Sequence, residues 1–128
     1  MSYIINTKKS PQPIGPYVQG IKINNLLMVS GQIPINNNGK IISEDIEQQT
    51  LQVLKNIKNI IEKADLHVHN IIKMTIFVTN LNDIKKINQI YQKFFIKNDS
   101  NFPSRTCVEV NKLPKNSKIE IDAIAIQN

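Results

Sequence analysis

The sequence predicts an α+β domain, and two observations support this. Short segments rich in β-branched and aromatic residues alternate with two longer segments of helical periodicity, in the order β-β-(β)-α-β-α-β-β. Each helical segment carries one apolar stripe, so we expect both helices to cover one face of a single mixed sheet. A chain of 128 residues fits one domain of ordinary size, and residues 1–128 show neither an internal repeat nor a linker.

The first part of the chain predicts a β-hairpin. Residues 17–23 (YVQGIKI) and 26–33 (LLMVSGQI) have the composition of strands. Asn24 and Asn25 lie between them, and asparagine tolerates the positive φ that a two-residue hairpin turn requires. We therefore expect these two strands to pair directly.

A short strand and a long helix are expected next. Residues 40–42 (KII) follow an Asn-rich turn and are expected to form a brief third strand. Ser43 can cap the following helix, and the two acidic residues after it favour the positive end of the helix dipole. Apolar residues then recur at helical spacing from Ile46 to Ala64, which predicts about five turns.

The second half predicts a strand, a helix and two further strands. Residues 70–79 form a β-rich run, and a helix is expected to start at Asn82 or Asp83. Residues 104–110 and 119–126 are predicted strands on either side of a connection that contains Pro and Asn. The apolar face of the second helix consists of Ile84, Ile87, Ile90, Tyr91, Phe94 and Phe95.

Several of the predicted strands are apolar on both faces. Residues 26–29 and 76–78 are continuous apolar runs rather than alternating ones. A sheet with this pattern needs cover on both sides, and the two helices supply one layer. We therefore expect the chain to self-associate through the second face of the sheet.

Composition disfavours several functional classes. The net charge is +6, but the lysines are spread along the chain and the few aromatic residues form no stacking platform, so a specific nucleic-acid partner is disfavoured. Ile, Asn and Lys all have A/T-rich codons, so genome composition explains much of the charge. The single cysteine fits a reducing compartment. No secretory signal or membrane-length apolar run appears, so we expect a cytoplasmic protein without a membrane partner.

Arg105 and Cys107 are each the only residue of their kind, against fifteen lysines. Arginine differs from lysine because its planar guanidinium can hold a carboxylate or a phosphate with two parallel hydrogen bonds. Arg105 is therefore expected either to bind an anionic ligand or to form an internal salt bridge. Glu120 on the last strand is the candidate partner for both interpretations.

The relative position of Arg105 and Glu120 depends on strand pairing. On an extended strand Arg105, Cys107 and Glu109 point to one side. If residues 104–110 pair antiparallel with the last strand, Arg105 and Glu120 can face the same side of the sheet. They would then form either a structural ion pair or a divided site, in which Arg105 holds a carboxylate and Glu120 acts on a water or a proton.

Other candidate groups have weaker support. A nucleophilic Cys107 would need an activating base, and a buried cysteine more often behaves as a small hydrophobe. His67 and His69 could supply two metal ligands, but a metal site needs a third, so a solvated turn is favoured and no metal is expected. The sequence contains no Gly-rich phosphate-binding loop.

Five segments, taken together, resemble one known family. They are SPQPIGPYVQG, VSGQIP, INQIYQKFF, FPSRTCVEV and KIEIDAIA, and they resemble the RidA (YjgF) family of reactive intermediate deaminases. The resemblance implies a chorismate-mutase-like α+β fold and a homotrimer with sites between subunits. It also implies cofactor-independent hydrolysis of 2-imino and 2-enamino acids, such as 2-aminoacrylate, to 2-oxo acids and ammonia.

The resemblance also implies roles for individual residues. Arg105 matches the carboxylate-binding arginine, and Glu120 matches the acid that handles water. Cys107 contacts the ligand through its backbone in that pattern. Ser104 and Asp122 depart from the residues common in the family, Ala and Glu. The other positions that match the lining of the substrate pocket are Tyr17, Ser30, Gly31 and Asn88.

Two alternatives stay open at this point. Members of the family have been described as endoribonucleases and translation inhibitors, and a charge of +6 permits RNA binding. A non-catalytic, chaperone-like trimer could also bind metabolites in the same clefts without accelerating the decay of imines.

Overall fold

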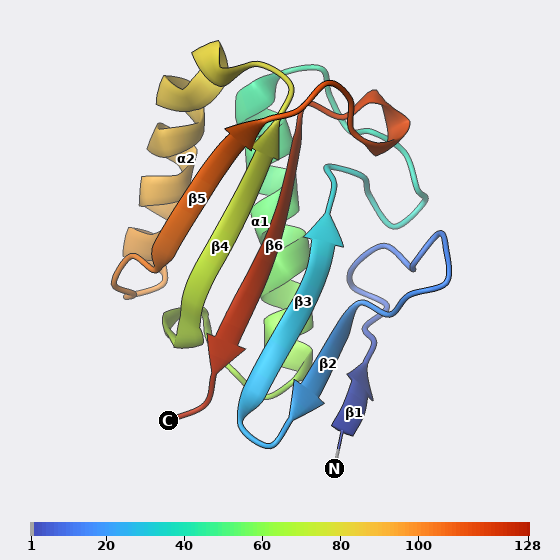
Figure 1. The fold of residues 1–128 in the computed structure, drawn as a ribbon, viewed down its shortest axis with the longest axis vertical. Coiled ribbons are helices and arrows are strands. Elements are labelled where there is room, and N and C mark those ends of the chain that lie inside the picture. The colour runs from blue at the N-terminus through green and yellow to red at the C-terminus, as the bar shows by residue number, and fades with distance from the viewer. Residues whose placement is uncertain (1) are drawn as a thin grey trace.

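Six strands form one mixed sheet in the computed structural model, which describes residues 2–128 (Figure 1). Two α-helices lie together on one face of that sheet, behind it in Figure 1, as the sequence predicts. Three 3-10 turns, Val68–Asn70, Leu81–Asp83 and Pro114–Asn116, connect other elements. The main elements are β1 (Ser2–Ile5), β2 (Gly20–Ile23), β3 (Leu26–Gln32), α1 (Ile46–Lys63), β4 (Ile71–Val78), α2 (Ile84–Lys97), β5 (Ser104–Glu109) and β6 (Ile119–Ile126).

The strand order explains why both helices share a face. The order is β1-β2-β3-β6-β4-β5, with β6 antiparallel to both β3 and β4, and with β4 parallel to β5. The crossovers β3-α1-β4 and β4-α2-β5 therefore both join parallel strands and move in the same direction across the sheet. Because such crossovers are right-handed, both helices fall on one side.

The predicted hairpin is confirmed, and so is the position of the second helix. Ile23 pairs with Leu26, which leaves Asn24 and Asn25 as a two-residue turn. Asn24 has φ 54°, the left-handed conformation that asparagine tolerates. The N-cap of α2 is Asp83.

Two local expectations are wrong. Asp45, not Ser43, caps α1, because its side chain accepts a hydrogen bond from the Gln48 N–H at 2.9 Å. Residues 40–42 form no strand, since only a single bridge joins Ile35 to Ile41. The strand β1 was not predicted, and it adds an edge to the sheet by pairing with β2.

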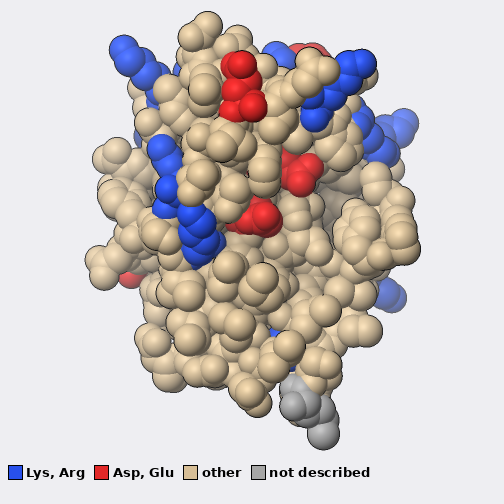
Figure 2. Space-filling view, viewed as in Figure 1, with Lys and Arg blue, Asp and Glu red and all other residues tan. Residues whose placement is uncertain are grey.

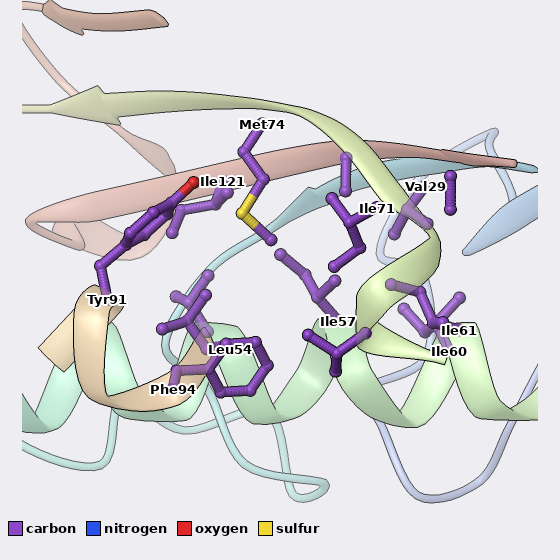
Figure 3. Close-up of a cluster of buried hydrophobic side chains, with 14 of the residues drawn as sticks. Val29, Leu54, Ile57, Ile60, Ile61, Ile71, Met74, Tyr91, Phe94 and Ile121 are labelled. Atoms are coloured by element: carbon purple, nitrogen blue, oxygen red, sulfur yellow. The ribbon is translucent and has the colours of Figure 1, made fainter. Parts of the chain in front are cut away.

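The core lies between the helices and the sheet (Figure 3). The inward stripe of α1 includes Leu54, Ile57 and Ile61, and none of these side chains is exposed to solvent. They meet strand residues such as Ile121 in the same buried cluster. Each buried aliphatic side chain of this size contributes roughly 1.5–3 kcal/mol. The apolar residues whose periodicity predicts the helices are therefore also the residues that pack the helices against the sheet.

The other face of the sheet has no helical layer. Ile21, Ile23, Met28 and Val108 on this side are 38–48% exposed. We call this side the open face. Figure 2, which looks onto it, shows mostly uncharged atoms with acidic side chains near the centre. Within residues 2–128, neither helix combines the length and apolar character needed to cross a membrane.

Candidate functional site

Arg105 lies at the edge of the sheet on the side that the helices cover. It is the second residue of β5, and its register partner on β4 is Met74, a fully buried core residue. Its Nη1 donates a hydrogen bond to the Asn88 Oδ1 of α2 at 2.8 Å. Its Cζ lies 5.0 Å from the centre of the Tyr91 ring, in cation–π range. The guanidinium is thus held in place by two uncharged groups, and neither of them neutralises its charge.

A cavity of about 330 Å³ opens beside this guanidinium. Arg105 is exposed enough to meet a ligand there. An oriented, unneutralised guanidinium beside a cavity of this size suits a small carboxylate. The walls are formed by Asn88, Tyr91, Gln92, Phe102, Pro103 and Arg105.

Cys107 lies two residues further along β5 on the same side of the strand. It is half-buried, and its register partner is the core residue Ile76. Burial raises the pKa of the Cys107 thiol, and the Arg105 charge offsets part of that rise. The thiol therefore stays protonated near neutral pH, which disfavours a nucleophilic role.

Glu120 occupies a second cavity, of about 370 Å³, on the open face. A Cβ added to Gly31 would overlap Glu120 Oε2 and would lie 2.9 Å from its Cδ. Because glycine has no Cβ, position 31 provides the space that the Glu120 carboxylate occupies. The cavity is lined by Ile14, Tyr17, Ser30, Gly31, Ile33, Pro114 and Glu120.

Two hydroxyl groups accompany Glu120. Ser30 Oγ donates to the Val18 carbonyl at 2.6 Å, so its lone pairs can accept a hydrogen bond from a ligand or a water. Tyr17 Oη accepts a hydrogen bond from the Ile14 N–H at 3.3 Å, so its proton is available to a ligand or a water. Burial raises the pKa of Glu120, and the neighbouring Asp122 carboxylate raises it further. A carboxyl group of this kind can take a proton as a base and return it as an acid.

The structure corrects the predicted pairing of Arg105 and Glu120. Strand β4 lies between β5 and β6, so the two strands are not neighbours. Met74 of β4 is the register partner of both Arg105 on β5 and Ala123 on β6, so these three side chains share one face of the sheet. Glu120 is three residues from Ala123, and because side chains alternate along a strand, it points to the other face. Arg105 and Glu120 therefore lie on opposite faces of the sheet, and they form neither an ion pair nor a common cavity within one chain.

The predicted site residues consequently separate into two groups. The first lies on the helix side of the sheet edge and includes the carboxylate-binding candidate. The second lies at the open face and includes the proton-transfer candidate. We call them the arginine half-site, which consists of Asn88, Arg105 and Cys107, and the glutamate half-site, which consists of Tyr17, Ser30, Gly31 and Glu120.

A family model for Endoribonuclease L-PSP matches residues 7–127 of the chain. The chain belongs to this family, the RidA/YjgF family. Among its relatives, a RutC family protein of Buchnera aphidicola subsp. Acyrthosiphon pisum is 58% identical over 99% of both chains. A protein of Escherichia coli strain K12 named 2-iminobutanoate/2-iminopropanoate deaminase is 46% identical, also over 99% of both chains.

Solved structures of RidA/YjgF proteins share the fold. The crystal structure of E. coli TdcF with bound serine superposes with a TM-score of 0.96 at 44% identity, covering 98% of this chain and 99% of that one. The E. coli YjgF gene product gives a TM-score of 0.95 at 45% identity, with the same coverage of both chains. The α+β architecture predicted from the sequence is therefore the architecture of this family.

The two histidines lie apart from both half-sites. The rings of His67 and His69 stack with their centres 5.3 Å apart, at the turn before β4. Among residues 2–128, no three His, Cys, Asp or Glu side chains come together as metal ligands.

Sequence reasoning gave no site role to four residues that line the cavity beside Arg105, which are Tyr91, Gln92, Phe102 and Pro103. Tyr91 was assigned only to the apolar face of the second helix, and Phe102 received no role. Tyr91 follows Asn88 by three residues on α2, a spacing that places both on one side of a helix. Phe102 is 58% exposed on the connection to β5, where no periodicity could have identified it.

Replacing Tyr91 by Phe should not destabilise the protein. Tyr91 is 5% exposed, and its Oη has no hydrogen-bond partner among residues 2–128. Burial raises the pKa of Tyr91 to about 12, partly offset by the Arg105 charge. An unsatisfied buried hydroxyl costs roughly 1–3 kcal/mol, so Tyr91→Phe should leave the free energy of unfolding unchanged or raise it by about 1 kcal/mol.

Urea unfolding at one fixed protein concentration would measure this change. Tyr91→Leu is the control, because it also removes the ring beneath Arg105 and should lower stability. A loss of more than about 1 kcal/mol in Tyr91→Phe would show that the hydroxyl has a partner.

Proposed function

We propose that the protein is a 2-imine deaminase whose active sites are shared between the subunits of a homotrimer. It would hydrolyse 2-imino and 2-enamino acids, such as 2-aminoacrylate, to 2-oxo acids and ammonia without a cofactor. One observation carries the proposal: Arg105, which can hold a carboxylate, and Glu120, which can transfer a proton, line separate cavities on opposite faces of one chain. The 46%-identical relative named 2-iminobutanoate/2-iminopropanoate deaminase supports the choice of substrate.

The open face supports assembly through this side of the sheet. It exposes large apolar side chains, including Ile21 and Met28, and it contains the glutamate half-site. Arg105 lies at the β5 edge of the same sheet. A neighbouring subunit that covers the open face can bring its β5 edge to Glu120. Because the two contacting surfaces differ, such contacts are head-to-tail and can close into a ring.

The two half-sites together suit hydrolysis of an imine. Arg105 binds the substrate carboxylate through two hydrogen bonds and so fixes the adjacent C=N carbon. Glu120 from the other subunit removes a proton from a water, whose oxygen bonds to that carbon while the C=N electron pair returns to nitrogen. Glu120 then returns the proton to the nitrogen. The resulting carbinolamine then loses its hydroxyl proton through Glu120 to the nitrogen. As the C–N bond breaks, its electron pair leaves with the nitrogen and the O–H electron pair forms the C=O bond, so a 2-oxo acid and ammonia leave. General acid–base assistance of this kind contributes typically about 10² to 10⁴-fold.

The pH dependence of activity should follow Glu120. It acts as a base in its ionised form, so activity rises as pH increases through its pKa, and that pKa is raised by burial and then by Asp122. Replacing Asp122 by Asn removes the second cause. The acid limb of kcat/KM in Asp122→Asn should therefore move to lower pH, with little change on the plateau.

A series of rate measurements from about pH 5 to 9 would detect this shift. Asp65→Asn is the control, since Asp65 lies in the turn after α1, where it has φ 62°. A limb that stays in place or moves to higher pH in Asp122→Asn would remove Glu120 as the titrating base.

The test of the proposed function is a coupled assay. A purified dehydratase or amino-acid oxidase generates the imine, and its absorbance is followed together with 2-oxo acid formation. The wild-type protein should accelerate decay of the imine. With Arg105→Ala, the imine should decay at its spontaneous rate although the variant remains folded. No acceleration by folded wild-type protein would contradict the proposal and favour a metabolite-binding role.

The description of the matching family model makes RNA cleavage the second candidate. Binding of a phosphate backbone predicts activity that weakens steeply with salt. RNA cleavage by highly purified protein that depends on salt and is lost in Arg105→Ala would support it. Cleavage that persists in Arg105→Ala would point to a contaminating nuclease.

A further inference from the structure

A groove runs between α1 and α2 on the helical side of the molecule. Its cavity of about 560 Å³ is separate from both half-sites. We propose that this groove binds an acidic amphipathic helix of a partner protein. The groove is lined by Leu51, Lys55, Lys58, Asn59 and Glu62 of α1 and by Ile90, Lys93, Phe94, Lys97 and Asn98 at α2.

The floor of the groove is apolar. Leu51 is 41% exposed, and Ile90 is half-buried. Phe94 is 7% exposed and reaches from α2 toward α1 beside Leu54 (Figure 3). Leu51 belongs to a different stripe of α1 from the residues that face the sheet, such as Ile57. An apolar stripe beyond the core is free to contact apolar side chains of another molecule.

The rim of the groove is basic. Two lysines line it from each helix, Lys55 and Lys58 on α1 and Lys93 and Lys97 on α2, against the single acidic residue Glu62. The rim therefore carries a net charge of +3, half of the chain's +6. Like charges on both sides repel each other, and an anionic partner would relieve that repulsion.

These two features together favour a helix over other anionic ligands. A nucleic-acid backbone would satisfy the lysines but would offer no apolar side chains to the floor. A fatty acid has one charge and would leave lysines on both sides without partners. A helix with apolar residues at i, i+4 and i+7 and acidic residues beside them meets the floor and both rims at once.

The length of the groove also suits a helix. Leu51 and Glu62 mark its ends on α1, and at about 1.5 Å per residue the distance between them is roughly 16 Å. That corresponds to about three helical turns of a partner. The two helices that line the groove lie on the side of the sheet away from the open face (Figure 1), so the groove and the open face share no residues. The proposal therefore stands independently of the proposed deaminase function.

The direct test uses a labelled model peptide. A fluorescein-labelled helix of about 15 residues, with leucines at i, i+4, i+7 and i+11 and flanking glutamates, is titrated with the full-length protein and followed by anisotropy. We expect saturable binding that weakens with salt. A scrambled peptide of the same composition and a peptide with Lys in place of Glu should each bind at least about tenfold more weakly.

Paired variants locate the binding site. Lys55→Glu with Lys93→Glu places one reversed charge on each rim and should weaken binding of the acidic peptide at least about tenfold. The control, Lys63→Glu with Lys85→Glu, makes the same change of net charge on the same two helices outside the groove. It should change the affinity less than about twofold. Leu51→Ser tests the floor and should also weaken binding.

Several results would overturn the proposal. They are the absence of saturable binding at low salt, equal binding of the scrambled peptide, and equal losses in the two double variants. If a single-stranded RNA or anionic vesicles bind more strongly than the acidic peptide, the groove's ligand is not a partner helix, and the proposal fails. Circular dichroism and gel filtration confirm that each variant keeps the fold and assembly of the wild type.

Discussion

Mixed trimers of Arg105→Ala and Glu120→Gln subunits should recover deaminase activity that neither parent trimer shows. The two residues lie on opposite faces of one chain, so each proposed site combines Arg105 of one subunit with Glu120 of another. In a one-to-one mixture, a site is intact when its arginine comes from a Glu120→Gln chain and its glutamate from an Arg105→Ala chain. With head-to-tail contacts, every hetero-trimer contains one intact site of three, so isolated hetero-trimers should reach about one third of wild-type activity, and the unfractionated random mixture about one quarter.

The experiment refolds the two variants together, with a different affinity tag on each. Hetero-trimers are then isolated through both tags, and their composition is checked by native mass spectrometry. Each parent refolded alone is the control and should stay inactive. If verified hetero-trimers show no more activity than the parents, Arg105 and Glu120 do not cooperate across an interface, and the shared-site proposal fails.

Arg105→Lys should lower kcat/KM for imine hydrolysis by at least about 100-fold with the assembly intact. Lysine keeps the positive charge but loses the planar pair of donors that orients a carboxylate. It also cannot reproduce the present geometry, in which Nη1 donates to Asn88 while the guanidinium lies 5.0 Å from the centre of the Tyr91 ring. The substrate would still be attracted, but its C=N carbon would no longer be fixed toward Glu120.

Steady-state kinetics on purified imine-generating mixtures would measure this loss, and gel filtration would report the assembly. Lys63→Arg, the reverse exchange on the last turn of α1, is the control and should leave the rate unchanged. Near-normal turnover by Arg105→Lys would show that charge alone is sufficient and would remove the bidentate argument.

Local patterns in the sequence predicted most of the elements correctly. The alternation along 104–110 placed Arg105 and Cys107 on one side of a strand, and their register partners Met74 and Ile76 confirm this. Helix α1 shows the limit of such patterns. Ser43 and Asp45 are both good capping residues, and the choice between them depends on which side chain reaches the first free N–H groups.

The relation between Arg105 and Glu120 could not be predicted from local patterns. Alternation shows which residues share a side within a strand, but the face that each strand presents depends on its neighbours. Here β6 is inserted between β3 and β4, although it is last in the sequence. That placement puts β4 between β5 and β6, so Arg105 and Glu120 lie on opposite faces of the sheet rather than on the same face. The residues of the implied pocket lie in two separate places. Asn88 and Arg105 line one cavity, and Cys107 lines neither. The other cavity is lined by Tyr17, Ser30, Gly31 and Glu120.

The open face has a consequence for inheritance of mutations. If each site needs two subunits, a chain that lacks both Arg105 and Glu120 inactivates two sites of its trimer, one through each of its neighbours. Such a variant would interfere with wild-type chains made in the same cell. Ile21 and Met28 belong to neither half-site, so substitutions there would lower activity only by preventing assembly. Chains that do not assemble leave wild-type trimers intact, so such substitutions would be recessive.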